Sequence, residues 1–144
     1  MFLDASAIVA ILSEEEDAES ILAKIKNARN GLFYSPIYAY ESVISLARKK
    51  TLIARDNGPI PPPLIDQAEE FVRHFLDEIN AIEIPVTMDI ERSAVSACKA
   101  YGSAVGHLAK LNMGDCFAYA CACSNGLPLL FKGNDFPHTD IAAA

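Results

Sequence analysis

The sequence begins Met1-Phe2-Leu3-Asp4-Ala5-Ser6, and this stretch decides the fold that we expect for the rest of the chain. Two apolar residues are followed by an acid, and residues 7–12 (AIVAIL) are apolar again. This pattern predicts a short buried strand that ends at Asp4 and leads directly into a buried helix. Ligands of open α/β sheets bind just beyond the carboxyl ends of the strands, which is where Asp4 lies. Asp4 or Ser6 could instead only cap the helix, because both residue types are good N-caps.

Short apolar segments alternate with helical patterns along the rest of the chain. This alternation predicts a three-layer α/β/α domain with a mostly parallel central sheet of four to five short strands. At 144 residues, the chain is expected to form one domain, residues 1–144. The further strands are expected at 32–34, 82–84 and 127–131, with a possible edge strand at Thr139–Ile141, and the further helices at 14–28, 36–50, 64–79, 87–101 and 112–125. Residues 56–63 (DNGPIPPP) predict a turn and an extended surface loop between two helices.

Three further acids are expected at the same edge of the sheet as Asp4. Asp135 follows the last strand, and Glu41 and Asp115 lie on helices that begin at that edge. Glu41 shares a helix face with the apolar residues Ile37, Tyr40, Ile44 and Ala47, and a buried carboxylate is costly unless it is paired or bound to metal. Alternatively, Glu41 could form a buried ion pair or lie at the edge of the apolar stripe. Asp115 could be only an acid that favours the start of its helix.

Four carboxylates at one point predict a metal site. They repel one another unless divalent cations lie between them. Oxygen ligands without cysteine or histidine partners select Mg²⁺ or Mn²⁺. A two-metal carboxylate site is suited to in-line hydrolysis of a phosphodiester bond.

Four longer stretches of the sequence resemble the PIN-domain ribonucleases, and in particular the VapC toxins of bacterial toxin–antitoxin pairs. They are MFLDASAIVAIL (1–12), SPIYAYESVISLAR (35–48), LNMGDCFAYACA (111–122) and LPLLFKGNDFPHTDI (127–141). The resemblance covers essentially the whole chain. It implies an acidic quartet of Asp4, Glu41, Asp115 and Asp135, supported by Ser6 beside the first acid.

The resemblance also identifies three departures or open points. Asp140 lies in a TD motif that recurs in the family, and the resemblance assigns no specific role to this residue. Many relatives have a second acid where this chain has Asn134, so Asp135 would act without it. The proline segment Pro59–Pro63 differs from the shorter connections that are expected.

The function implied by the resemblance is that of a magnesium-dependent endoribonuclease, the toxin of a type II pair. Asp4 and Asp115 would anchor the principal metal ion, and Glu41 and Asp135 would complete the pocket and help to hold a second ion or the attacking water. RNA, possibly tRNA, would be the substrate, and the products would have 5′-phosphate and 3′-hydroxyl ends. A VapB-type antitoxin, small and DNA-binding, would be the partner, and the toxin would be a homodimer.

Two alternatives remain open. The chain could be a catalytically silent PIN-fold binding module that still pairs with an antitoxin. It could also be a receiver-like phospho-acceptor domain, although such a domain needs an aspartate at the end of its third strand, where this chain has Pro85.

The charge distribution affects the expected contact with RNA. A net charge of −7 argues against binding to nucleic acid when it is averaged over the whole surface. Basic residues that gather at one helix end and in the loop after it predict a local RNA-binding cluster, although they also suit a helix C-terminus. These residues are Arg48, Lys49, Lys50 and Arg55.

The composition indicates a folded cytoplasmic protein without membrane association. Hydrophobic residues make up 51% of the sequence, which argues against disorder. No apolar run approaches the roughly 20 residues that a membrane span needs, and the N-terminus lacks the features of a signal peptide.

Overall fold

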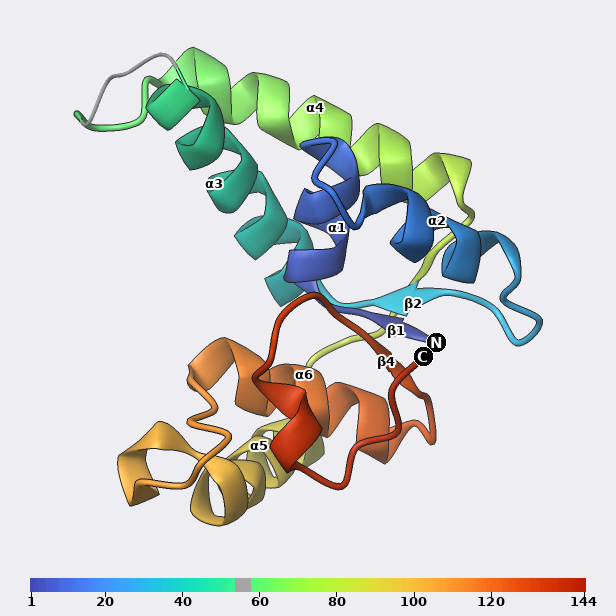
Figure 1. Cartoon of the computed structure of the whole chain (residues 1–144), viewed down its shortest axis with the longest axis vertical. Helices are drawn as coiled ribbons and strands as arrows, with labels where there is room; N and C mark the ends of the chain where they lie inside the picture. The colour runs from blue at the N-terminus through green and yellow to red at the C-terminus, as the bar shows by residue number, and fades with distance from the viewer. Residues whose placement is uncertain (54–57) are drawn as a thin grey trace.

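The computed structural model describes residues 1–53 and 58–144 and contains a four-stranded parallel sheet (Figure 1). The strands are β1 (Phe2–Leu3), β2 (Phe33–Tyr34), β3 (Ile82–Glu83) and β4 (Leu129–Leu130), in the order β3-β2-β1-β4. The first strand is therefore central, and Asp4 directly follows it. The predicted α/β fold with a parallel sheet of short strands is confirmed.

Helices cover both faces of the sheet (Figure 1). One layer contains α1 (Ala5–Leu12), α2 (Ala18–Lys26), α3 (Pro36–Ile53) and α4 (Pro62–Glu78), and the other contains α5 (Met88–Tyr101) and α6 (Met113–Ser124). Two short 3-10 helices lie at Ser103–Val105 and Phe136–His138. No described helix is both long and apolar enough to cross a membrane.

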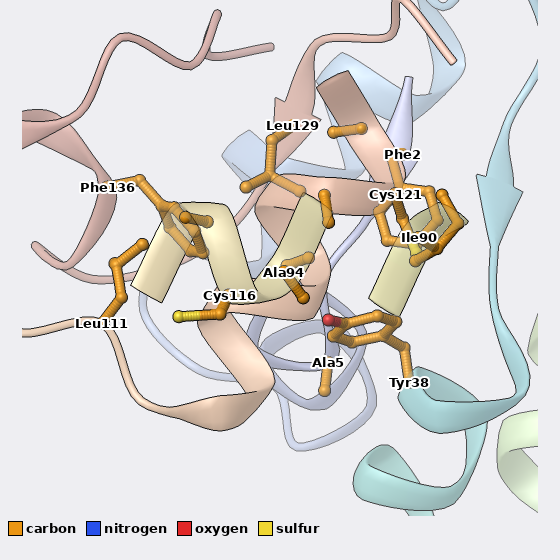
Figure 2. Close-up of a cluster of buried hydrophobic side chains, with 14 of the residues drawn as sticks. Phe2, Ala5, Tyr38, Ile90, Ala94, Leu111, Cys116, Cys121, Leu129 and Phe136 are labelled. Atoms are coloured by element: carbon orange, nitrogen blue, oxygen red, sulfur yellow. The ribbon is translucent and has the colours of Figure 1, made fainter. Parts of the chain in front are cut away.

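Alternation along the central strands divides the apolar core into two clusters. Phe2 and Leu129 point into the cluster shared with α5 and α6, whereas Leu3 and Leu130 point into the cluster shared with α1 to α4. This is the period of two that a strand imposes when helices cover both of its faces. Figure 2 shows Tyr38 reaching from α3 into the first of these clusters.

The predicted buried face of α3 is wrong at Tyr40. That side chain is 69% exposed, whereas Tyr38 is fully buried. The buried positions of α3 are Tyr38, Ser42, Val43, Leu46, Ala47 and Thr51. The helix packs against α1 and α4, and this arrangement rotates the buried face away from Tyr40. Periodicity alone could not distinguish the two tyrosines.

Two predicted boundaries also differ from the structure. The loop predicted at 56–63 ends before Pro63, because α4 begins at Pro62 after an N-cap at Pro61. Asp56 and Asn57 of this loop lie outside the described residues. Proline is compatible with the first helical turn, where its missing N–H would have no partner in the helix. The possible edge strand at Thr139–Ile141 is wrong, because Ala143 pairs with Leu129 instead.

Candidate functional site

Asp4 both caps α1 and lies at the end of β1. Asp4 is buried, with 8% of the residue exposed. Its Oδ2 accepts a 2.9 Å hydrogen bond from the Ser6 N–H and another hydrogen bond from the Ser6 hydroxyl. The Ser6 hydroxyl oxygen in turn accepts a 2.9 Å hydrogen bond from the Lys132 N–H. Ser6 therefore connects the first acid to the loop that follows β4 and contains Asp135.

Asp115 lies in the first turn of α6 and belongs to a capping box. Its Oδ2 accepts a 2.8 Å hydrogen bond from the Asn112 N–H, and Asn112 Oδ1 accepts a 3.1 Å hydrogen bond from the Asp115 N–H. This reciprocal pair fixes the direction of the Asp115 carboxylate relative to the helix start. The helix-start role considered for Asp115 is therefore present, together with its place beside the other acids.

Glu41 approaches the start of α6 because position 114 is a glycine. A Cβ atom at Gly114 would lie 3.2 Å from Glu41 Oε2, closer than nearly all Cβ contacts. The Tyr38 hydroxyl donates a 2.6 Å hydrogen bond to the Gly114 carbonyl, which ties α3 to the same turn. The helices that contain Glu41 and Asp115 are thus joined at this point.

One pocket of about 430 Å³ gathers the four predicted acids. They reach it from the end of β1, from α3, from the first turn of α6 and from the loop after β4. Its lining residues are Asp4, Ala5, Ser6, Val9, Glu15, Glu41, Ser45, Asp115, Lys132, Gly133, Asp135 and Phe136.

Burial and neighbouring carboxylates raise the pKa values of Asp4, Glu41 and Asp115. The pKa of Asp4 is raised by burial and then by the charge of Asp135. Burial and the charges of Asp4 and Asp115 raise the pKa of Glu41. The pKa of Asp115 is raised by burial and by Asp135 and Asp4, against the hydrogen bond from Asn112. The negative charge is therefore concentrated and costly at this point in the absence of a cation.

The donor set fits a hard divalent cation. Carboxylate oxygens that repel one another are the ligands that Mg²⁺ and Mn²⁺ select, and a cation between them would relieve the repulsion. Residues 1–53 and 58–144 contain no group of three or more His, Cys, Asp or Glu side chains already arranged to hold a metal ion.

Asn134 and Asp140, predicted to support the site, are not among the residues that line the pocket. Asp140 instead accepts a 2.6 Å hydrogen bond from the Tyr119 hydroxyl. Hydrogen bonds from Tyr119 and Tyr101 lower the pKa of Asp140. The TD motif thus fastens the segment after Phe136–His138 to α6. Asn134 is exposed in the loop before Asp135.

The predicted RNA-binding residues do not point in one direction. Arg48 donates a 2.9 Å hydrogen bond to the Gly58 carbonyl, and the Lys50 ammonium lies 4.2 Å from the centre of the Phe71 ring. Lys49 forms an ion pair with Glu15. Arg55 lies outside the described residues. Lys49 therefore differs from Arg48 and Lys50, because its ion-pair partner Glu15 lines the pocket.

Sequence reasoning missed the role of Glu15 and Lys132 in the pocket wall. The helix predicted at 14–28 would place Glu15 in its first turn. Instead, α2 begins at Ala18, and Glu15 lies before this helix and contacts two lysines. A spacing signal was available for Lys49, because Glu41, Ser45 and Lys49 follow one another at intervals of four residues along one face of α3.

Comparison with known proteins agrees with this fold. The sequence matches the family profile described as PIN domain over residues 1–142, and the chain belongs to this family. A VapC ribonuclease of Rhizobium meliloti is 40% identical over 97% of this chain and 98% of its own length. Ribonuclease VapC42 of Mycobacterium tuberculosis is 36% identical over 100% of this chain and 98% of its own.

Solved structures show the same fold at lower sequence identity. VapC20 of Mycobacterium tuberculosis, described as a sarcin-ricin loop cleaving toxin, aligns with a TM-score of 0.70 and 14% identity over 99% of this chain and 97% of that one. A chain of a toxin–antitoxin complex from Klebsiella pneumoniae aligns with a TM-score of 0.67 and 18% identity over 99% of this chain and 95% of that one.

Proposed function

We propose that this chain is a metal-dependent endoribonuclease and the toxin of a toxin–antitoxin pair. The main supporting observation is that carboxylates from four separate segments line one pocket. The full-length similarity to curated VapC ribonucleases supports RNA as the substrate. We further propose Mg²⁺, or Mn²⁺, as the cofactor.

Each acid has a distinct proposed role. Asp4 and Asp115 would hold the principal metal ion, because hydrogen bonds from Ser6 and Asn112 fix their orientation. Glu41 and Asp135 would complete the pocket and accept hydrogen bonds from the attacking water. When bound, the metal supplies Lewis acidity and lowers the pKa of a coordinated water. Ser6 would hold Asp4 in a fixed position relative to the loop that contains Asp135, because it forms hydrogen bonds with both Asp4 and the Lys132 N–H.

The proposed partner is a VapB-type antitoxin. The Klebsiella pneumoniae structure is a toxin–antitoxin complex, which supports such a partner for this chain. The family resemblance also suggests a homodimer, and a structured RNA such as tRNA as the substrate. Cleavage by metal-activated water would leave 5′-phosphate and 3′-hydroxyl ends.

The test is the loss of cleavage in single-charge variants. Asp4→Asn and Asp115→Asn should each reduce Mg²⁺-dependent RNA cleavage by more than about 100-fold, since outer-shell changes alone cost 10- to 100-fold in metal sites. Chelator should stop cleavage by the unaltered protein. Ca²⁺ should restore it poorly, because Ca²⁺ favours looser coordination than the octahedral geometry of Mg²⁺.

Asp66→Asn is the matched control, because it removes the same charge from an exposed position of α4. It should leave cleavage unchanged. Circular dichroism would verify that every variant is folded. Full cleavage by a folded Asp115→Asn protein would refute the assignment, and a folded unaltered protein that cuts no RNA with Mg²⁺ would favour the silent binding module.

A further inference from the structure

Two lysines and one glutamate form an ion-pair cluster at the rim of the acidic pocket. Glu15 pairs with Lys49 through Oε1, and Lys132 Nζ lies 2.5 Å from Glu15 Oε2. Lys132 Nζ also lies 3.2 Å from Asp17 Oδ2. Glu15 and Lys132 line the pocket itself, and Lys49 continues the face of α3 on which Glu41 and Ser45 line it. We call Glu15, Lys49 and Lys132 the rim cluster.

The rim cluster differs chemically from the four acids beside it. Hydrogen bonds from Lys132 and Lys49 lower the pKa of Glu15, whereas the pKa values of Asp4, Glu41 and Asp115 are raised. Glu15 is therefore a carboxylate already matched by cations, and it is not a fifth member of the acidic set.

An acidic pocket repels a polyanion, so an RNA strand needs positive charge close to it. Among the described residues that line the pocket, Lys132 is the only cationic one. Its side chain is 31% exposed and that of Lys49 is 35% exposed, so solvent reaches both ammonium groups. Each ammonium has three N–H donors and can exchange a carboxylate oxygen for a phosphate oxygen with its charge still matched.

We propose that Lys49 and Lys132 bind a phosphate group of the RNA strand at the rim of the pocket. Glu15 holds both ammonium groups in place until the phosphate replaces it. This inference rests on the proposed ribonuclease function. It selects one lysine from the basic cluster expected from the sequence and adds a second lysine from the loop after β4.

A purely structural role makes different predictions. In that case the ion pairs only fasten the turn before α2 to α3 and to the loop after β4. Their removal would then lower the melting temperature without a specific change in the affinity for RNA or in its salt dependence.

The test measures binding of a fluorescent single-stranded RNA of mixed sequence as a function of salt, with Mg²⁺, in an Asp115→Asn background that prevents turnover. Lys49→Gln combined with Lys132→Gln should lower the slope of log affinity against log salt by about 0.7, the value for one neutralised phosphate of a single strand. Lys49→Arg with Lys132→Arg keeps both charges and should retain the slope.

Lys26→Gln with Lys99→Gln is the matched control, because it removes two charges from exposed positions that do not line the pocket. Its slope should equal that of the background. Equal slopes for the rim and control variants would overturn the inference, and so would loss of binding in the folded Arg variants. If the rim variants fail in this way while the unaltered protein still cleaves RNA, the proposed function stands. An unaltered protein that neither binds nor cleaves RNA refutes both.

Glu15→Gln tests the exchange of carboxylate for phosphate. This change leaves both lysines and removes the one anion that pairs with both of them, so RNA should bind more tightly at low salt. Glu16→Gln removes the same charge from an adjacent exposed residue and should have no effect. Unchanged or weaker binding by a folded Glu15→Gln protein would show that Glu15 does not compete with phosphate.

Discussion

Tyr38 shows how one side chain connects the core to the site. Its ring is fully buried and meets Phe2 edge-on, with the ring centres 5.3 Å apart. Its hydroxyl donates to the Gly114 carbonyl in the first turn of α6. Burial and the nearby acids, Asp4 first among them, raise the pKa of Tyr38, so the hydroxyl remains a protonated donor. The apolar ring and the polar tip therefore both position Glu41 and Asp115.

Removing only the hydroxyl should destabilise the fold modestly. Tyr38→Phe keeps the ring and should lower the free energy of unfolding by about 0.5–1.5 kcal/mol, the usual net value of one hydrogen bond. Urea denaturation would measure this change. Tyr40→Phe is the control, because Tyr40 is exposed and its change should stay within about 0.5 kcal/mol. Equal stability of the two variants would mean that the bond to Gly114 contributes nothing.

Helix α3 serves three purposes with three of its faces. Tyr38, Ser42 and Leu46 lie in the buried face. Glu41 and Ser45 line the pocket, and Lys49 continues that line. The last turns present the remaining basic side chains outward, with Arg48 near Gly58 and Lys50 over the ring of Phe71. A helix can serve such different environments because neighbouring residues point about 100° apart around its axis.

The outward basic residues provide a test at the level of this element. If the end of α3 lies on the RNA path, Arg48→Gln with Lys50→Gln should weaken RNA binding and lower the salt slope by about 1.4. The affinity for Mg²⁺ should not change, because neither residue lines the pocket. Fluorescence binding and metal titration would measure the two quantities. An unchanged salt slope would leave these residues with the ordinary role of basic side chains at a helix C-terminus.

At the scale of the whole molecule, concentrated negative charge should make stability depend on metal and pH. The chain has a net charge of −7, and the pKa values of Asp4, Glu41 and Asp115 are raised from ordinary values of 3.8, 4.5 and 3.8. Raised values mean that the folded state binds protons more tightly than the unfolded chain. With chelator, the stability from these groups is therefore full below the ordinary values and is lost as pH rises through the raised ones.

Thermal melts of Asp115→Asn should separate the metal-site role from the helix-start role. The variant keeps an acceptor oxygen for the Asn112 N–H and removes one repelling charge. It should melt at or above the unaltered protein in chelator at neutral pH. It should also lose most of the rise in melting temperature that millimolar Mg²⁺ produces by binding only the native state.

The opposite result would assign Asp115 to the helix start alone. The variant would then lose a favourable dipole interaction of about 0.3–1 kcal/mol and melt below the unaltered protein in chelator. It would keep the whole response to Mg²⁺. Asp66→Asn, at an exposed position of α4, would show the effect of removing a charge elsewhere.

The strands and helices of this protein can be predicted from the sequence, because the patterns that determine them involve residues close together in the chain. Phe2 and Leu3 followed by Asp4 predict a strand that ends at an acid, and the alternation of strands and helices predicts a parallel sheet. In a parallel sheet, the carboxyl ends of the strands lie at the same edge, so residues that follow these strands are expected to lie near one another. These steps were sufficient to predict that four acids approach one place, and the pocket lined by all four agrees with that prediction.

Only the tertiary structure decided which side chains meet across the chain. Tyr38 and Tyr40 have similar local patterns, and the packing of α3 against α1 and α4 selected which one is buried. Glu15 meets a lysine 34 residues away and another 117 residues away. Such contacts depend on the strand order β3-β2-β1-β4, which brings the loop after β4 beside the start of α1. Local periodicity fixes the face on which a residue lies, but the order of the strands determines what that face contacts.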